Sequence, residues 1–515
     1  MKFWFNLRRR VLAAVTVVVT TGALGSDGSA SPAVWPTRAW QESTPEQQGV
    51  ASDAVRRLLD FGAANEIDSL LLVRHGKLVV DAYYAPYRSG IRHVVNSATK
   101  AVMGTLVAVA VQDGLLKNTS QPMVTFFGDK TSAGPAADRQ AITVQHLLDM
   151  TSGLDWKEPL DGLPESMLQM RRSPDWLSFV LGRPMAQAPG TAFNYNSGNS
   201  QLLSGVLTKL SGRSAADFAR ERLFVPLGIT DIVWRQDPQD LTTGGFGLSM
   251  HPRDMAKIGY LYLHKGVWQG RQLLPSNWTD TVARASVDMH QSYAPSLRYA
   301  NGWWVFPQRG VYMAVGYHRQ LIVVLPKFDM VAVLTGKSHY SFDLLLGLLE
   351  ASASSPVPLP ENAMAHAELA RRVRELATEQ PSSVGPTPAL ANKISGQTYR
   401  FAINQLGLES MVLDLTSAKP GYELRFQGVG AVGGTSRMLA PIGLDGRLRT
   451  TDSATGRMLA TKANWVDGQT LAMVSHAIGE GEVTHYTLHF GDGTVDVSVR
   501  HNSGFKAELR GVAVP

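Results

Sequence analysis

The order of the apolar patterns along the chain constrains its fold more than any other feature. Two strand-like runs flank the turn at Arg74–Lys77, and helical spacing of apolar residues then dominates up to about residue 235. Strand-like runs return afterwards, at 302–306, 311–315, 321–325 and 330–334. Strands that enclose a helical stretch predict an α+β domain, with an antiparallel sheet flanked by helices and a helical subdomain inserted between the two groups of strands.

The last third of the 515-residue chain has a different pattern. Residues 351–392 contain several prolines and one charged, helix-like piece, which is typical of a linker. From 393 to 515 the sequence consists of short alternating runs separated by turns, and this pattern predicts an all-β domain, either a barrel or a sandwich. We therefore predict a first domain at 45–350, a linker at 351–392 and a small all-β auxiliary domain at 393–515.

The N-terminal residues have the composition of an export signal. Lys2 and Arg8–Arg10 precede a nearly continuous apolar run, Val11–Gly25, and small residues follow up to Ala30. We predict a signal peptide at 1–30 that is removed on export, by the general or the twin-arginine route, which leaves a periplasmic or secreted protein. The apolar run is shorter than a membrane-spanning helix, so we expect no stable membrane anchor.

Composition excludes several classes of function. The chain contains no cysteine, which rules out disulfides, a cysteine nucleophile and thiolate metal sites. Its formal net charge is +6, of which the predicted leader contributes +3 through Lys2, Arg8, Arg9, Arg10 and Asp27, so the mature chain carries +3. This charge is too small to predict a nucleic-acid partner. No motif in the sequence implies a cofactor or a bound metal ion.

The segment Asn96-Ser97-Ala98-Thr99-Lys100 leads into a helix-like apolar run and contains a candidate nucleophile. Residues three apart share a helix face, so Lys100 can reach the Ser97 hydroxyl. A serine hydroxyl needs a base to remove its proton, and a lysine can serve if burial lowers its pKa. The apolar run at 102–111 predicts such burial, and free N–H groups at the helix start favour a developing oxyanion. We therefore interpret Ser97 as the nucleophile.

The same Ser-x-x-Lys spacing occurs a second time, at Ser503–Lys506. There it follows Asn502 in an Asn-Ser-Gly turn between strand-like runs, so the serine and the lysine share no helix face. We interpret this copy as a chance match without a catalytic role.

Tyr195 and Ser197 form a second group of candidates, two residues apart and just before a helix-like stretch. A tyrosinate stabilised by a lysine cation can act as general base toward Ser97 or as proton donor to a leaving group. Ser197 can pass protons or hold Lys100 in place. The structural alternative is that Tyr195 is a core aromatic residue and Ser197 an N-cap.

Four sequence features together resemble the serine β-lactamase and penicillin-binding-protein superfamily. They are the Ser-x-x-Lys box at Ser97, the Tyr-x-Ser box at Tyr195, and the segments 147–154 and 245–255. The resemblance is to the class C-like branch, which contains β-lactamases, D,D-peptidases, esterases and 6-aminohexanoate-dimer hydrolases, and it covers about residues 45–350. It implies a β-lactamase/D,D-peptidase-like fold.

The resemblance also implies a third box, Lys-Thr-Gly or His-x-Gly, on a strand that lines the site within 316–324. Here the chain departs from the family pattern, because Tyr317, His318 and Arg319 stand where small residues are expected. His318 would supply the donor of that box, or else be a surface or loop histidine, and Arg319 would crowd the strand or bind a substrate carboxylate. The oxyanion hole would comprise the N–H of Ser97 and one near Gln320.

These features predict an exported serine hydrolase that cleaves a small-molecule or short-peptide-like amide or ester through an acyl-serine intermediate. Lys100 and Tyr195 would share proton transfer, and their coupled titrations leave the identity of the base open. Two alternatives remain: a β-lactamase or D,D-carboxypeptidase, and a non-catalytic, penicillin-binding-like sensor or binding protein. The sequence implies no cofactor and does not indicate the oligomeric state.

Overall fold

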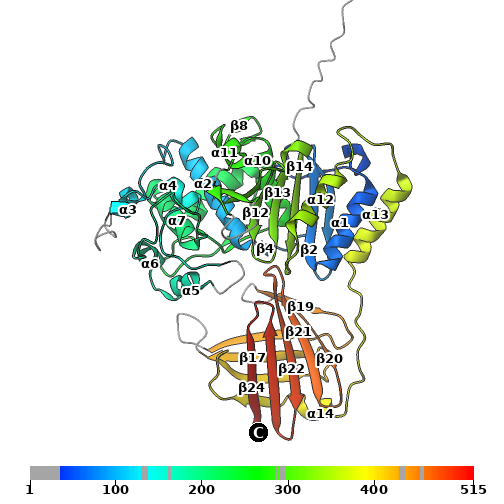
Figure 1. Ribbon diagram of the computed structural model, residues 1–515. Helices are drawn as coiled ribbons and strands as arrows, with labels where there is room; N and C mark the ends of the chain where they lie inside the picture. The colour runs from blue at the N-terminus through cyan, green and yellow to red at the C-terminus, as the bar shows by residue number, and fades with distance from the viewer. Residues whose placement is uncertain are drawn as a thin grey trace, which may run out of the picture. The chain divides into compact units, whose positions relative to one another are not determined.

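The strand-like runs on both sides of the helical stretch pair into one nine-stranded sheet (Figure 1). Its strands, from one edge to the other, are β1 (Gln41–Glu42), β3 (Lys77–Tyr83), β2 (Ile67–Arg74), β14 (Met330–Gly336), β13 (Gln320–Leu325), β12 (Val311–Gly316), β11 (Trp303–Phe306), β10 (Arg298–Ala300) and β9 (Val287–Asp288). Neighbouring strands are antiparallel, except that β1 and β3 run parallel. This computed structural model confirms the predicted α+β class.

The structure describes residues 35–128, 137–159, 164–285, 287–289, 296–427, 435–452 and 457–514. The signal peptide predicted at 1–30 lies outside these residues. Residues 34–515 form one compact unit. Within the described ranges, no helix combines the length and the apolar composition that crossing a membrane requires.

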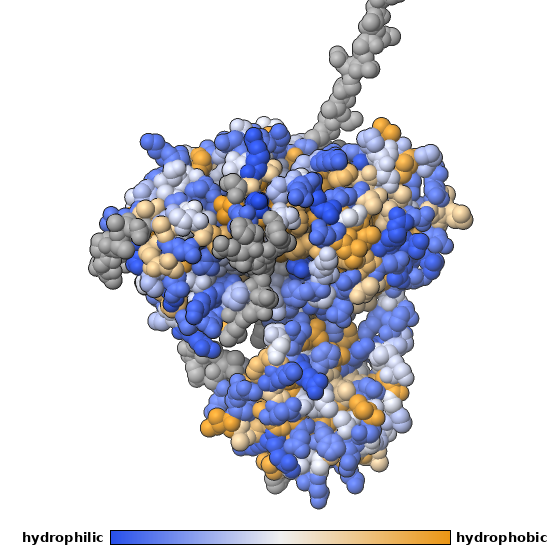
Figure 2. Space-filling model, viewed as in Figure 1, coloured by the Kyte–Doolittle hydropathy of each residue, from blue (hydrophilic) through white to orange (hydrophobic). Residues whose placement is uncertain are grey.

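Both faces of the nine-stranded sheet are buried, because successive side chains of a strand point to opposite sides. In β2, Leu71 and Val73 join one apolar core, and Leu70 and Leu72 join the other. Helices cover both faces (Figure 1): α2 (Thr99–Gln112) and α10 (Pro252–Leu263) on one, and α1 (Ser52–Ala64), α12 (Phe342–Ser352) and α13 (Ala363–Leu376) on the other. Hydrophilic residues cover most of the face shown in Figure 2, as expected when the large apolar side chains fill the cores.

The helical stretch between the two groups of strands forms the predicted inserted subdomain. Its longest helix, α7 (Ser197–Ser211), packs against α2, α4 and α6 and so joins the subdomain to the sheet. Thr143 caps α4, since its side chain accepts from the His146 N–H at 3.2 Å, and the helix ends at Leu148. The remaining elements of this region are β4 (His93–Val94), α3 (Ala137–Gln140), α4 (Val144–Leu148), α5 (Glu165–Arg172), α6 (Trp176–Leu181), α8 (Ala215–Ala219), α9 (Val225–Leu227), β5 (Val233–Trp234), β6 (Leu248–Met250), β7 (Val267–Trp268), β8 (Arg271–Gln272) and α11 (Trp278–Ala283).

The charged helix inside the predicted linker packs against the first domain. Leu369 of α13 is buried in the apolar core on the α1 side of the sheet. Arg372 of the same helix donates to the Asp60 carboxylate of α1 at 2.9 Å. This part of 351–392 therefore belongs to the packed core, because its apolar side chains find a partner in α1.

The C-terminal residues form a second, ten-stranded sheet that follows α14 (Leu390–Ile394). In spatial order its strands are β18 (Thr435–Pro441), β17 (Gly421–Gln427), β16 (Leu408–Asp414), β15 (Thr398–Phe401), β24 (Lys506–Val514), β23 (Thr494–His501), β22 (Glu482–Phe490), β21 (Thr470–Ala477), β20 (Met458–Trp465) and β19 (Arg449–Asp452). The sheet curls until β18 lies beside β19 and β20, and a bridge between Gly443 and Lys462 closes it into a barrel-like form. The all-β prediction is confirmed, but the sequence patterns did not predict β18, β19 or β20.

Helix α2 packs closely against the backbone at Asn301. A Cβ added at Gly104 would lie 2.2 Å from the Asn301 carbonyl oxygen, whereas one added at Gly347 of α12 would meet nothing within 4 Å. We expect Gly104→Ala to lower the free energy of unfolding by about 1–3 kcal/mol through overpacking. Gly347→Ala, the matched control, should raise it by about 0.5–1 kcal/mol through helix propensity. Urea unfolding measures both, and equal stabilisation by the two changes would contradict the close approach.

Candidate active site

Ser97 lies where the chain turns from a short strand into the buried helix α2. Residues Asn96–Ala98 form a 3-10 helix, and α2 begins directly afterwards at Thr99. Asn96 has a φ of 49°, in the left-handed region, and the Ala98 N–H donates to the Val95 carbonyl at 3.0 Å. Helix α2 is buried from Thr99 to Ala110 because it is apolar on every side. Ser97 therefore stands at the start of a helix, as predicted, but one short turn ahead of it.

Lys100 is buried beside Ser97, with 3% of its surface exposed. Its Nζ donates to Ser97 Oγ at 3.1 Å, to Ser197 Oγ at 3.0 Å and to the Gly245 carbonyl oxygen at 2.9 Å. An ammonium group has three protons, so these three acceptors use all of them. The structure thus brings together Ser97, Lys100 and Ser197, which come from both sequence boxes.

Gly245 holds its carbonyl close to Lys100 because it has no side chain. A Cβ at this position would lie 3.3 Å from Lys100 Nζ and 3.2 Å from the Ser197 Cβ. Sequence reasoning placed Gly245 in the segment that resembles the family, but it did not predict this contact. A backbone acceptor has no residue-type signal that sequence reading could use.

Glu158 is a further residue of the site that sequence reasoning missed. Ser197 Oγ donates to Glu158 Oε1 at 2.6 Å, and the Ser197 N–H donates to Oε2 at 2.8 Å. Trp156 Nε1 also donates to Oε2, at 2.7 Å. The carboxylate therefore fixes Ser197 by its hydroxyl and its backbone. A lone glutamate 39 positions from its serine partner gives no spacing signal, and only its place shortly after the 147–154 segment pointed toward it.

The Tyr195 side chain packs beside Lys100 at the edge of the core. Lys100 Nζ lies 4.7 Å from the centre of its ring, a distance that suits a cation–π contact. Its ring also belongs to the apolar core on the α1 side of the sheet. Asn196, not Ser197, caps α7, because Asn196 Oδ1 accepts from the Asn199 N–H at 3.1 Å. The N-cap alternative for Ser197 is thus wrong by one residue, whereas Tyr195 both fills the core and contacts the lysine.

The segment predicted to hold the third box forms the turn between β12 and β13. Gly316 pairs with Gln320 across the ladder, and the three residues between them make the turn. His318 and Arg319 have φ values of 61° and 60°, a left-handed conformation that costs other residues more than glycine. The turn touches the segment that contains Ser97, since Asn96 Nδ2 donates to the Tyr317 carbonyl at 3.2 Å.

His318 is buried in this turn, with 3% of its surface exposed. Its ring packs on Tyr317, with 3.9 Å between ring centres, and its Nδ1 faces Gly481 of the C-terminal sheet. Burial, and then the nearby His339 and His501, lower its pKa to about 4. Within the described ranges no hydrogen bond links His318 to Ser97, Lys100 or Tyr195. His318 is therefore a buried histidine in a loop, which agrees with the loop alternative and not with the surface one, and its donor role remains a prediction.

Arg319 and Gln320 both direct their side chains toward the end of β14. The Arg319 guanidinium donates twice to the Tyr340 carbonyl, at 3.1 and 2.8 Å, and lies 3.8 Å from the centre of the Phe342 ring. This anchoring uses two of the five N–H donors of the guanidinium, and the expected roles of Arg319 remain predictions. Gln320 Nε2 donates to the Gly336 carbonyl at 2.7 Å, and the oxyanion role of a backbone N–H near Gln320 remains a prediction.

The buried His318 makes folding stability depend on pH. Its folded-state pKa of about 4 lies below the ordinary 6.5, so the unfolded chain binds the proton more tightly. The contribution of the neutral His318 to the free energy of unfolding is complete above pH 6.5 and is lost as the pH falls toward 4. At pH 5 the loss should reach about 2 kcal/mol. Urea unfolding measures this effect. Between pH 7 and pH 5, the free energy of unfolding of His318→Gln should fall by about 2 kcal/mol less than that of the wild type. The exposed control His485→Gln should match the wild type.

Glu158→Gln replaces one acceptor oxygen by an amide that cannot accept, so either the hydroxyl or the N–H of Ser197 loses its partner. We expect the change to weaken the contact of Ser197 with Lys100 and to remove the proton acceptor at Glu158, so the rate at which a fluorophosphonate labels Ser97 should fall roughly 100-fold or more. Intact mass measured over time gives this rate. Exposed Glu165→Gln on α5 is the control, and labelling of Glu158→Gln at the wild-type rate would contradict the positioning role.

Known proteins resemble the first domain of this chain. The β-lactamase family model matches residues 52–353. The 6-aminohexanoate-dimer hydrolase of Paenarthrobacter ureafaciens is 25% identical over 313 residues, which cover 56% of this chain and 79% of that protein.

Two solved structures share the fold. A putative 6-aminohexanoate-dimer hydrolase from Bacillus anthracis has a TM-score of 0.53 at 21% identity and covers 64% of this chain and 90% of its own. EstCE1, a hydrolase with promiscuous acyltransferase activity, has a TM-score of 0.51 at 15% identity and covers 60% and 99%. With the family match extending over more than half of its length, this chain belongs to the β-lactamase family of hydrolases.

Proposed function

We propose that this protein is an exported serine hydrolase that cleaves an amide or an ester through a covalent acyl-serine intermediate. One observation carries the proposal: the buried Lys100 Nζ lies between the Ser97 and Ser197 hydroxyls, 3.1 and 3.0 Å from them. A serine within hydrogen-bond reach of a buried base is the arrangement that nucleophilic catalysis requires. Export rests on the composition of residues 1–30 alone.

The hydrogen bonds around Lys100 provide a path for the proton of Ser97. They form a continuous chain from Ser97 Oγ through Lys100 Nζ and Ser197 Oγ to Glu158 Oε1. When Lys100 gives a proton to Ser197 and Ser197 gives its own to Glu158, Lys100 becomes a neutral amine. Rotation of the neutral amine about its Cε–Nζ bond then turns the lone pair toward the Ser97 hydroxyl, where it can accept that proton. Tyr195 is the second candidate base, since its ring lies against the same lysine.

The reaction then follows two acyl-transfer steps. Ser97 Oγ bonds to the substrate carbonyl carbon, its proton passes to the base, and the N–H groups of Ser97 and Gln320 stabilise the oxyanion. The carbon–nitrogen or carbon–oxygen bond breaks as the leaving group takes a proton, for which the Tyr195 hydroxyl is the proposed donor. Water attacks the acyl-serine in the second step, and Ser97 regains its proton as the acid leaves.

The substrate class is a small-molecule or short-peptide-like amide or ester, without a nucleic-acid partner or a cofactor. Short linear amides are the first substrates to test, because one relative by sequence and one by fold are named 6-aminohexanoate-dimer hydrolases. A β-lactamase or D,D-carboxypeptidase would share the acyl-serine and differ only in substrate. A penicillin-binding-like sensor would keep the scaffold but would not turn over substrate.

The nucleophile can be tested directly on the purified mature chain. The wild type should gain one fluorophosphonate adduct on the peptide that contains Ser97, not on the one that contains Ser503, and should hydrolyse p-nitrophenyl acetate. Ser97→Ala should lose the adduct and at least roughly 10³-fold in kcat, because no other group can form the acyl-enzyme. Ser417→Ala, an exposed serine in a turn, is the control.

The released chromophore separates the alternatives. Turnover of p-nitrophenyl esters or p-nitroanilides without nitrocefin cleavage supports an esterase or amidase, whereas nitrocefin cleavage identifies a β-lactamase. If the wild type neither labels nor turns over, the acyl-serine proposal fails, and a binding protein becomes the better description.

A further inference from the structure

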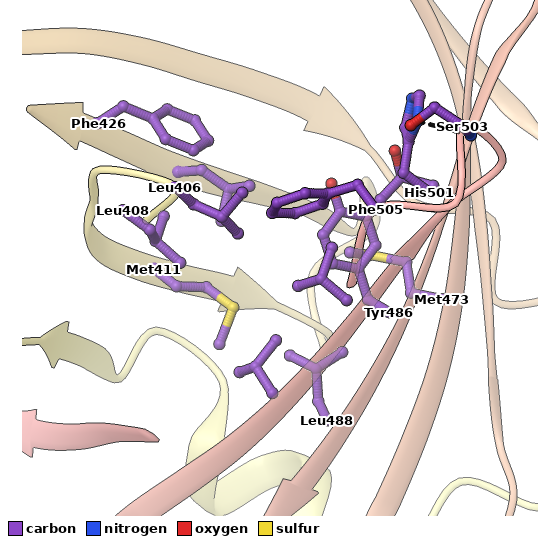
Figure 3. A pocket seen from close by; sticks show the side chains of 14 residues that line it. Leu406, Leu408, Met411, Phe426, Met473, Tyr486, Leu488, His501, Ser503 and Phe505 are labelled. Atoms are coloured by element: carbon purple, nitrogen blue, oxygen red, sulfur yellow. Dashed lines mark hydrogen bonds between the residues drawn. The ribbon is translucent and has the colours of Figure 1, made fainter. Parts of the chain in front are cut away.

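The barrel-like C-terminal sheet contains a cavity of about 270 Å³ (Figure 3). This volume lies near the lower end of ligand pockets, which span roughly 300–1,000 Å³. Side chains normally fill protein interiors, and unfilled space costs stability. A cavity of this size can therefore accept an apolar group of a ligand.

The lining of the cavity is almost entirely apolar. Leucine, methionine, valine and phenylalanine side chains from β16, β17, β21, β22 and β23 form most of it, together with Leu406 and Phe505 from the adjoining turns. Polar side chains are contributed only by Thr484, Tyr486, His501 and Ser503. Such a surface favours an aliphatic chain over water, because water needs polar partners.

The polar groups mark one side of the cavity. In Figure 3, His501 and Ser503 lie together there, joined by a hydrogen bond of 2.7 Å, and Met411 and Leu488 lie on the opposite side. Phe505 reaches across the space between them and is 39% exposed. The cavity is thus open near the turn at 501–505, which connects β23 to β24. A chain could enter there with its polar end toward solvent.

This open side lies next to the catalytic domain. Asn502 Nδ2 donates to the Gly481 carbonyl at 2.8 Å, which ties the 501–505 turn to the turn between β21 and β22. In that second turn the Gly479 carbonyl accepts from the Val94 N–H at 2.6 Å. A Cβ at Gly481 would lie 3.0 Å from His318 Nδ1. The turns at the cavity mouth therefore contact both the strand that leads to Ser97 and the β12–β13 turn.

We propose that this cavity is a subsite for the aliphatic chain of the substrate, so that the enzyme prefers esters or amides with medium-length acyl groups. The proposal rests on the proposed function at Ser97 for its catalytic part. The C-terminal sheet would then supply specificity, while the first domain supplies the chemistry. No covalent step takes place in the cavity itself.

Direct binding tests the cavity without relying on catalysis. Full-length Ser97→Ala protein is titrated with cis-parinaric acid, a fluorescent fatty acid. We expect one saturable site, weakened at least tenfold by Val499→Phe, which fills the cavity, and by Phe505→Glu, which places a charge at its exposed mouth. Val512→Phe, the same enlargement at a position that is 54% exposed on β24, should bind like the parent. Absence of saturable binding, or equal binding by all variants, would overturn the proposal.

Activity tests the link between the cavity and Ser97. With p-nitrophenyl esters from acetate to dodecanoate, kcat/KM of the wild type should rise with chain length. Val499→Phe and Phe505→Glu should lose that rise and keep acetate hydrolysis, whereas Val512→Phe should retain both. Binding without this chain-length effect overturns the subsite. If the wild type hydrolyses no ester at all, including acetate, the proposed function fails, and that result is distinct from a loss of the chain-length effect alone.

Discussion

The buried ammonium group of Lys100 is the constraint on which the site depends. A charge removed from water needs polar partners, and Lys100 finds its three in Ser97, Ser197 and the Gly245 carbonyl. These partners belong to the start of α2, the start of α7 and the segment before β6. The sheet and the inserted helices must therefore pack correctly before the charge is satisfied. Glycines permit this convergence, since a Cβ at Gly302 would lie 2.4 Å from the Lys100 carbonyl oxygen.

Much of the fold follows from local patterns. Continuous apolar runs such as β13 and β14 are buried on both faces, and the Thr143 cap of α4 is readable from residue types alone. Strand β20 is different, because Ala460, Lys462 and Asn464 have little intrinsic preference for strands. Its conformation is imposed by pairing with β19 and β21. Similarly, the sequence of α13 alone is typical of a charged linker helix. The helix joins the core only because α1 packs against it and Leu369 is buried there.

Some residues of the site follow from local sequence patterns, and others meet only through tertiary packing. Ser97 and Lys100 are three residues apart, so their meeting follows from helix geometry, and Ser197 follows from its resemblance to a family box. Glu158 and the Gly245 carbonyl meet the same lysine network only through tertiary packing, which short-range spacing does not encode. The direction of Arg319 was equally hidden, because the left-handed turn at His318 and Arg319 determines where both side chains point. Sequence patterns therefore pointed to the candidate reacting groups better than to the groups that hold them.

The contact between Gly481 and His318 gives the C-terminal sheet an electrostatic effect on the first domain. Desolvation is the largest cause of the lowered pKa of His318, and part of the surface that excludes water from it comes from the turn at Gly481. The charge state of a residue next to the Ser97 segment is thus set partly by the C-terminal sheet. The C-terminal sheet thus keeps water away from His318 at the β12–β13 turn. As a result, the His318 imidazole stays neutral at a mildly acidic pH that would protonate an exposed histidine.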